Sequence, residues 1–174
     1  MYSKEFRILD LFCGAGGFSY GLHTVEGFST EVALEWDPVI INTFKKNMPD
    51  TDCVCGDICD EKIKEIVINK AKERKVNMII GGPPCQSWSE AGALRGINDK
   101  RGQLFFDFIR ILQDKQPLFF LAENVSGMLL GRHSEALSNI KICLQMLELA
   151  MNYHLICLMH MIIMSRKIVK GYFL

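Results

Sequence analysis

Phe6-Arg-Ile-Leu-Asp-Leu-Phe-Cys-Gly-Ala-Gly-Gly-Phe-Ser19 is the stretch that decides the fold. Its first half is a short apolar run typical of a buried strand, and its glycines let the backbone turn sharply into a helix and approach a ligand closely. The alternation continues, with strands expected at residues 29–35, 51–54, 76–80 and 117–122, and helices at 18–26, 38–46, 61–75, 101–114 and 133–150. This order predicts an α/β fold, a parallel sheet with helices on both faces.

The composition is that of a single globular domain. The 174 residues include 20 basic and 20 acidic side chains, and 49% of them are apolar. A net charge of zero excludes a global positive field, so any contact with nucleic acid must be local or come from other segments. The start does not resemble a secretory signal, and the apolar stretch 155–164 is too short to span a bilayer, so we expect a cytoplasmic protein without membrane contact.

The seven cysteines are odd in number and lack paired spacing, which predicts reduced thiols. Cys53, Cys55 and Cys59 lie close together, but their spacing matches no common zinc pattern and a fourth ligand is not evident. The sequence therefore predicts no metal site.

Residues after the first two strands suggest an adenosine-containing cofactor. Glu35 ends the second strand, where a carboxylate can accept hydrogen bonds from both ribose hydroxyls, and Trp36 offers a flat face for a base. NAD fits less well, because Ser19 stands where the dinucleotide fingerprint needs a third Gly or Ala. The alternative is a glycine-rich turn that binds no ligand.

Two further strand ends bear reactive groups. In Gly81-Gly-Pro-Pro-Cys-Gln-Ser-Trp-Ser89 the prolines restrict the backbone and hold Cys85 at the mouth of the sheet, where a thiolate can act as a nucleophile. Glu123 ends an apolar strand, so we expect it to be partly desolvated, which raises its pKa and suits it to proton transfer. The polar loop 86–102 has the length of a functional lid. The alternatives are an inert cysteine and a glutamate that caps a turn or pairs with lysine.

Three blocks together resemble the DNA (cytosine-5-)-methyltransferases: residues 10–19, Gly82-Pro-Pro-Cys-Gln86 and Glu123-Asn-Val125, in that family's order and spacing. The resemblance covers about residues 6–157 and implies a Rossmann-like, S-adenosylmethionine-dependent methyltransferase core. The stretch from Cys85 to Glu90, with Arg95 and Arg101 each followed by glycine, most resembles bacterial type II restriction–modification enzymes, in particular those that modify GGCC sites.

This resemblance implies a role for each matching residue. Cys85 would attack carbon 6 of a cytosine flipped out of the duplex, and Glu123 would hold ring nitrogen 3 and the exocyclic amine. The residues implied in binding S-adenosylmethionine are Phe12, Gly14, Gly16, Phe18, Glu35, Trp36, Asp57, Ile58 and Leu104. Those implied in contacting double-stranded DNA are Gln86, Ser87, Ser89, Arg95, Arg101 and Asn124. A cognate restriction endonuclease would act on the same DNA site without needing to touch this protein.

Two other functions remain open. The chain can be a cofactor-binding fragment, or half of a methyltransferase split over two chains. An RNA cytosine methyltransferase would share Pro-Pro-Cys and Glu-Asn-Val, although Ser87-Trp-Ser89 favours DNA.

The tail differs from the rest of the chain. After Glu148 none of the remaining residues is acidic, and four of the nine methionines lie there. We expect residues 1–157 to be an incomplete catalytic and cofactor core and residues 158–174 to be non-family sequence from a frameshift. Synonymous codons can be chosen for this tail so that the same nucleotides, read in another frame, encode a different peptide. That peptide is Leu-Asn-Ala-Tyr-Asp-Tyr-Asn-Val-Pro-Gln-Asp-Arg-Lys-Arg-Val-Phe, which resembles the family's next block. Such a chain would lack a sheet strand and the target recognition domain, so we expect poor stability and little or no methylation.

Overall fold

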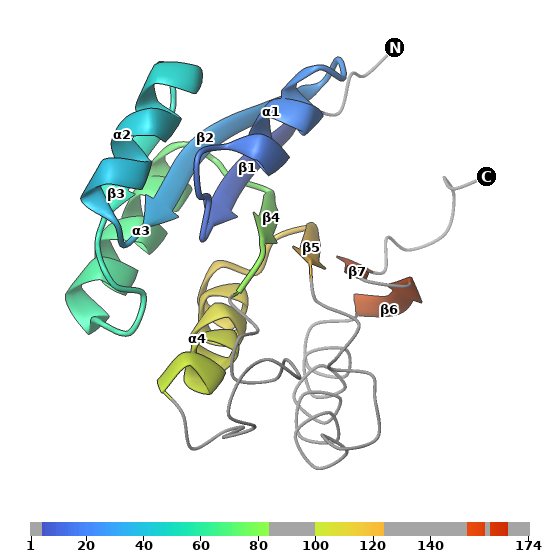
Figure 1. The fold of residues 1–174 in the computed structure, drawn as a ribbon. Helices are drawn as coiled ribbons and strands as arrows, with labels where there is room; N and C mark the ends of the chain where they lie inside the picture. Colours follow the sequence, from blue (N-terminus) through green and yellow to red (C-terminus); the bar gives the residue numbers. More distant parts are fainter. Residues whose placement is uncertain (1–4, 84–99, 124–152, 159–160, 167–174) are drawn as a thin grey trace.

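The computed structural model describes residues 5–83, 100–123, 153–158 and 161–166 (Figure 1). Their strands form one sheet in the order β3-β2-β1-β4-β5-β7-β6. The bounds are β1 (Phe6–Leu11), β2 (Phe28–Glu35), β3 (Asp52–Cys55), β4 (Met78–Gly81), β5 (Phe119–Glu123), β6 (Tyr153–Leu158) and β7 (Met161–Arg166). Strands β1 to β5 are parallel, and β7 runs antiparallel to both β5 and β6.

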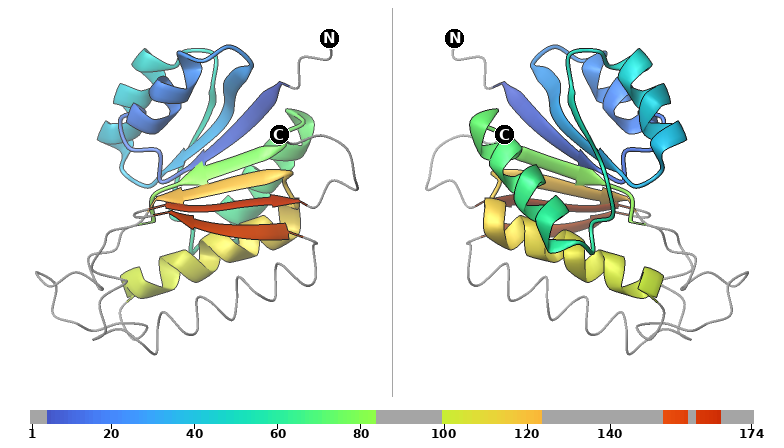
Figure 2. Two further views of the ribbon diagram at one scale, coloured as in Figure 1. Left: turned by 90° about the vertical axis from the view of Figure 1, so that its right-hand side faces the viewer. Right: turned by 90° about the vertical axis from the view of Figure 1, so that its left-hand side faces the viewer.

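Helices cover both faces of the sheet, as the sequence predicts (Figure 2). α1 (Gly17–His23) and α2 (Pro38–Asn47) lie on one face, and α3 (Glu61–Glu73) and α4 (Lys100–Lys115) on the other. Asp37 begins α2 because its carboxylate accepts the N–H groups of Val39 and Ile40, while Pro38 stands at the first position, where no donor is needed.

The main core lies between the sheet and the pair α3 and α4. It joins Leu9, Leu11 and Ile79 of the strands to Val67 of α3 and Phe108 of α4, all fully buried. The opposite face holds smaller clusters under α1 and α2. Because both faces are covered, the strands appear in the sequence as continuous apolar runs, and this is why their bounds are predicted within two residues.

Two differences from the sequence-based expectation concern α1 and the tail. α1 ends at His23, three residues earlier than predicted, because the chain turns through Thr24 to Gly27, whose φ is 90°. The tail does supply a strand to the sheet, contrary to the expectation. Residues 161–166 form β7, which pairs with every residue of β5. An apolar Met-Ile-Ile-Met run suits a strand with neighbours on both sides, whatever its origin. The helix expected at 133–150 lies outside the described residues.

None of the helices in the described part of the chain is both long and apolar enough to cross a membrane.

A buried ion pair ties α3 to α4. Lys64 is 6% exposed, and its Nζ lies 2.9 Å from Asp107 Oδ1 and 2.7 Å from Glu61 Oε1. We expect Lys64→Met to lower the free energy of unfolding by about 2 kcal/mol, because it leaves Asp107 without its nearest cation. Urea denaturation measures this. Lys62→Met, on the exposed side of the same helix, should change it by less than about 0.5 kcal/mol. Equal losses in the two variants would contradict the prediction.

Candidate active site

The carboxyl ends of the parallel strands form one rim. Leu34, Leu11, Gly81 and Ala122 lie in one row across β2, β1, β4 and β5. The next residue of each strand or turn therefore stands at the same edge: Glu35, Phe12, Gly82 and Glu123. Ligands of open α/β sheets bind at this edge.

A left-handed turn follows β1. Phe12, Gly14 and Gly16 have φ values of 61°, 56° and 97°. A Cβ added at Gly16 would lie 3.0 Å from the Phe44 ring, whereas one at Gly14 or Gly17 would meet no atom within 4 Å. The turn is therefore packed against α2 at Gly16 and open on its outer side, where a ligand can approach the backbone of Gly14 and Gly17.

Glu35 holds this turn in place. Its Oε2 accepts the N–H of Gly14 at 3.1 Å, and its Oε1 accepts the N–H groups of Trp36 and Asp37 at 3.0 and 3.2 Å. The side chain is 7% exposed. A carboxylate has about four acceptor sites, and three are taken, so it has room for one further hydroxyl rather than two. Trp36 beside it is 71% exposed and presents a free aromatic face.

The other predicted cofactor contacts divide between two sides of the sheet. Phe12 and Leu104 are partly buried against the main core, which also contains Ile58. Asp57, next to Ile58, is exposed, and its carboxylate accepts the N–H of Cys59. Phe18 instead packs on the cluster under α1. Phe12, Ile58 and Leu104 thus belong to the core on the α3 and α4 side of the sheet, and Phe18 to a cluster on the other side.

Glu123 reaches the start of the segment that leads to Cys85. A Cβ added at Gly82 would lie 3.0 Å from Glu123 Oε2, so this carboxylate sits directly against the backbone of Gly82. Glu123 is exposed, not partly desolvated as expected, because it projects past Ala122, the last buried residue of β5, beside a glycine that cannot cover it.

The comparisons with known proteins agree with this architecture. The family model of the C-5 cytosine-specific DNA methylases matches residues 6–159. This chain belongs to that family.

Relatives in the family are longer. The type II methyltransferase M.NgoPII of Neisseria gonorrhoeae is 56% identical over 134 residues, which are 77% of this chain and 37% of that protein. M.FnuDI of Fusobacterium nucleatum is 50% identical over 134 residues, 77% of this chain and 36% of that protein. The chain therefore spans little more than a third of either relative.

Solved structures show the same fold. A crystal structure from E. coli, described as a prophage-encoded DNA modification methyltransferase, superposes with a TM-score of 0.74 at 29% identity, over 94% of this chain and 47% of that one. DNMT2 of Spodoptera frugiperda gives a TM-score of 0.68 at 22% identity, over 97% of this chain and 52% of that one, and shows the fold alone.

Several family residues predicted from the sequence lie outside the described residues: Cys85, Gln86, Ser87, Ser89, Arg95 and Asn124. Arg101 lies in the first turn of α4. Their placement in this member of the family stays a prediction.

The sequence-based search for site residues missed Asp10. It is buried at the end of β1, and Ser19 Oγ donates a hydrogen bond to its Oδ2 at 2.5 Å. An acidic residue inside an apolar strand was the available signal, since carboxylates are rarely fully buried without a partner.

Two of the three clustered cysteines, Cys53 and Cys59, have thiols with a raised pKa. Burial, with Asp57 and Asp107 nearby, raises the pKa of Cys59 to about 12, and burial also raises the pKa of Cys53. Among the residues the structure describes, no group of three or more His, Cys, Asp or Glu side chains could hold a metal ion.

Proposed function

We propose that this chain is the cofactor-binding and catalytic part of a DNA (cytosine-5-)-methyltransferase. The observation that carries the proposal is the Glu123 carboxylate against Gly82, at the same rim as the open glycine turn. Three elements far apart in the sequence thus bring an acid, the start of the Pro-Pro-Cys segment and a ligand cradle to one edge. Family membership of residues 6–159 supports it.

S-adenosylmethionine fits the residues that are present. The turn at Gly14 and Gly17 has open space where a side chain would stand, Glu35 has one acceptor site left, and Trp36 is free to stack on a flat base. Asp57, Ile58 and Leu104 would border the adenine, with Phe12, Gly16 and Phe18 shaping the turn. When bound, this cofactor supplies an electrophilic methyl group.

Cys85 and Glu123 would activate the cytosine. The Cys85 sulfur forms a bond to carbon 6, and the electron pair displaced from the 5,6 double bond makes carbon 5 nucleophilic. Glu123 holds ring nitrogen 3 and the exocyclic amine, which stabilises the charge that develops on the ring. The cytosine must leave the stack for this attack, and a flipped base would also cover the exposed Glu123 carboxylate.

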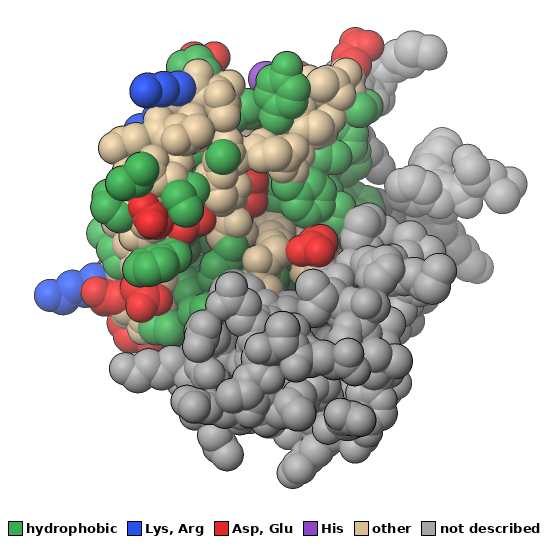
Figure 3. Space-filling model, in the orientation of Figure 1, with side chains coloured by type: hydrophobic (Ala, Val, Ile, Leu, Met, Phe, Trp, Pro, Cys, Tyr) green, Lys and Arg blue, Asp and Glu red, His purple; other side chains and the backbone are tan. Residues whose placement is uncertain are grey.

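Contacts with double-stranded DNA would come from Gln86, Ser87, Ser89, Arg95, Arg101 and Asn124. On the face shown in Figure 3, basic side chains of the described residues lie at the left margin, while acidic and apolar ones occupy the middle. We propose that phosphate contacts come from these segments and from the further parts that longer relatives contain. We infer that the protein acts in a bacterial cytoplasm, where an endonuclease acts on the same DNA site without needing to touch it. That this site is GGCC stays a prediction.

The test measures transfer of tritiated methyl groups from S-adenosylmethionine into duplex DNA. We expect little or no incorporation with the 174-residue chain alone, because base contacts that specify a site need a recognition domain. Co-expression with the downstream reading frame should restore incorporation if this chain is half of a split enzyme. In the active pair, Cys85→Ser should abolish incorporation. The control is Cys53→Ser, which replaces a half-buried thiol on β3 and should retain incorporation. Incorporation that survives Cys85→Ser would overturn the proposal.

We also propose that residues 1–157 are family sequence and residues 158–174 are a frameshifted tail. The family match ends at residue 159, close to the proposed boundary, and this supports it. Sequencing the coding DNA tests it: codons that cannot spell the family block in another frame exclude a frameshift.

A further inference from the structure

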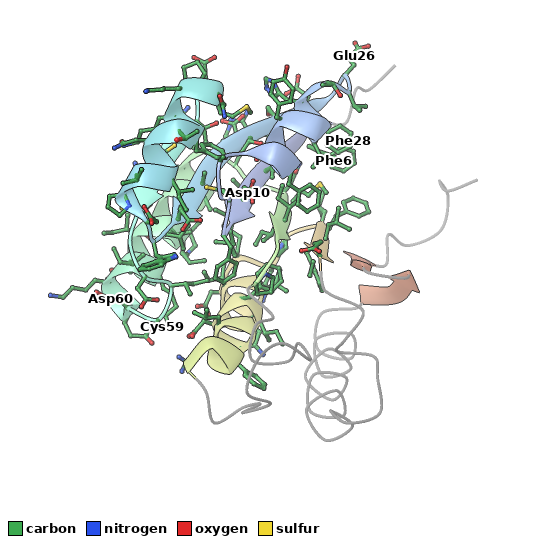
Figure 4. The ribbon with its side chains drawn as sticks, viewed as in Figure 1. Phe6, Asp10, Glu26, Phe28, Cys59 and Asp60 are labelled. Atoms are coloured by element: carbon green, nitrogen blue, oxygen red, sulfur yellow. The ribbon has the colours of Figure 1, made fainter. Side chains whose placement is uncertain are left out.

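Asp10 is a buried carboxylate, and Ser19 is its one hydrogen-bond partner among the described residues. Asp10 is 1% exposed, it stands one residue before the end of β1, and it accepts a hydrogen bond from the Ser19 hydroxyl of α1 at 2.5 Å. Figure 4 shows Asp10 within the body of the sheet, beside α1. Only Leu11 separates it from Phe12, where the glycine-rich turn 12–17 begins. Asp10 therefore lies beneath the cradle without lining it.

Within the described part of the chain, no positively charged side chain pairs with Asp10. The titratable groups that act on it are Glu35 from β2 and Cys13 from the turn, and α1 offers only the Ser19 hydroxyl. The neighbour across β4 is apolar Ile80. Among the described residues no Lys or Arg forms an ion pair with Asp10 or Glu35.

Burial and repulsion from Glu35 raise the pKa of Asp10 to about 7, although the Ser19 hydroxyl opposes the rise. The Cys13 thiol stays protonated, since burial raises its pKa strongly. Asp10 is therefore partly ionised near neutral pH, and a cation placed on the turn above it would favour the ionised form. The hydrogen bonding of Glu35 differs from that of Asp10, because three backbone N–H groups donate to the Glu35 carboxylate.

We propose that Asp10 makes the turn selective for the cationic methyl donor over the neutral product of methyl transfer. This inference rests on the proposed function. S-adenosylmethionine has a sulfonium cation, whereas S-adenosylhomocysteine has an uncharged thioether, and the two molecules are otherwise alike. A carboxylate beneath the turn attracts the first and has no such attraction for the second, so it favours release of product.

A structural role for Asp10 predicts a different result. If the side chain only pins α1 to β1, asparagine serves as well, because its carbonyl oxygen accepts the same Ser19 hydrogen bond. A role through charge requires that Asp10→Asn weaken donor binding and leave product binding unchanged.

The experiment is calorimetric titration of the 174-residue chain with S-adenosylmethionine and with S-adenosylhomocysteine from pH 6 to 8.5. Because the sulfonium cation also lowers the pKa of the donor's own amino group, the ratio of the two dissociation constants is compared between the parent chain and Asp10→Asn at each pH, where this ligand titration is the same. In the parent chain we expect preference for the donor to rise through about pH 7. Relative to the parent chain, Asp10→Asn should show nearly the same preference at pH 6 and a preference roughly fivefold lower at pH 8.5, through weaker donor binding alone.

Two variants sharpen the test. Ser19→Ala removes the hydrogen bond that lowers the pKa of Asp10, so the rise in donor preference should move to higher pH. Asp114→Asn, exposed near the end of α4 at the opposite edge of the sheet, should behave like the parent.

An unchanged ratio in Asp10→Asn, or equal weakening of both ligands, overturns the inference and leaves the cofactor site standing. If neither ligand binds the parent chain, the proposed site and the inference fall together.

Discussion

At pH 8 the Asp10→Asn variant is expected to be more stable than the parent chain by about 2–4 kcal/mol. The pKa of Asp10 is about 7 in the folded chain, against an ordinary value of 3.8, mainly because burial removes water from the ionised form. Between these two values the folded chain binds more protons than the unfolded chain, so its stability falls as the pH rises from about 4 through about 7. Asparagine has the same shape and no charge to bury.

Urea denaturation at pH 4 and pH 8 measures this effect. Below about pH 4 the parent side chain is protonated in both states, so the two proteins should differ little there. Asp114→Asn, which removes an exposed carboxylate, should show no such dependence on pH. A gain of the same size at pH 4 and pH 8 would show that the charge of Asp10 is not what destabilises the fold.

A stability gain from removing Asp10 gives its presence a physical meaning. Buried groups that weaken a fold are typical of sites where a ligand later compensates them. If Asp10→Asn stabilises the chain and also removes its preference for the cationic donor, both results come from one uncompensated charge. A stability gain with unchanged ligand preference would mean that the charge of Asp10 weakens the fold but does not select the donor.

Gly81→Ala should lower the free energy of unfolding by about 3 kcal/mol. Gly81 ends β4, and an added Cβ would lie 2.7 Å from the backbone oxygen of Leu11 and 3.0 Å from the Phe108 ring. Because one of these atoms belongs to the central strand β1, it cannot move without disturbing the sheet. The shift would also displace Gly82 from Glu123, so in the active pair with the downstream reading frame the variant should lose more methyl transfer than its stability alone explains.

Gly21→Ala is the matched control for Gly81→Ala. Gly21 lies in α1 on the exposed side, and a Cβ there would meet no atom within 4 Å. Alanine should stabilise the chain by about 0.5–1 kcal/mol, because it restricts the unfolded state and favours the helix. Thermal or urea denaturation compares the two variants. Similar losses in both would mean that close packing at Gly81 is not the cause.

Most of the fold could be predicted from local patterns. The apolar runs ending at Leu11, Glu35 and Gly81, and the helix start at Pro38, need only the composition of neighbouring residues. The end of α1 and the strand β7 could not be predicted in this way. Whether Met-Ile-Ile-Met forms a strand depends on the free edge of β5. Even the paired residues closest in sequence, Glu123 and Met161, are 38 residues apart.

The candidate site divides in the same manner. The residue types at the rim, Glu35, Trp36 and Glu123, were recognisable because each follows an apolar strand. Their environments were not: Glu35 proves largely occupied by backbone donors, and Glu123 proves exposed. Both results depend on which backbone atoms the fold brings beside each carboxylate.

The amino-acid sequence by itself determined the order of strands and helices, the family and the chemical groups at the strand ends, because these follow from periodicity and from motifs contiguous in the chain. Only the tertiary structure decided that Asp10 is buried against the Ser19 hydroxyl of α1 and that Gly81 touches Leu11. The physical reason is that burial and close contact arise between segments that are distant in the chain, and no local pattern records them.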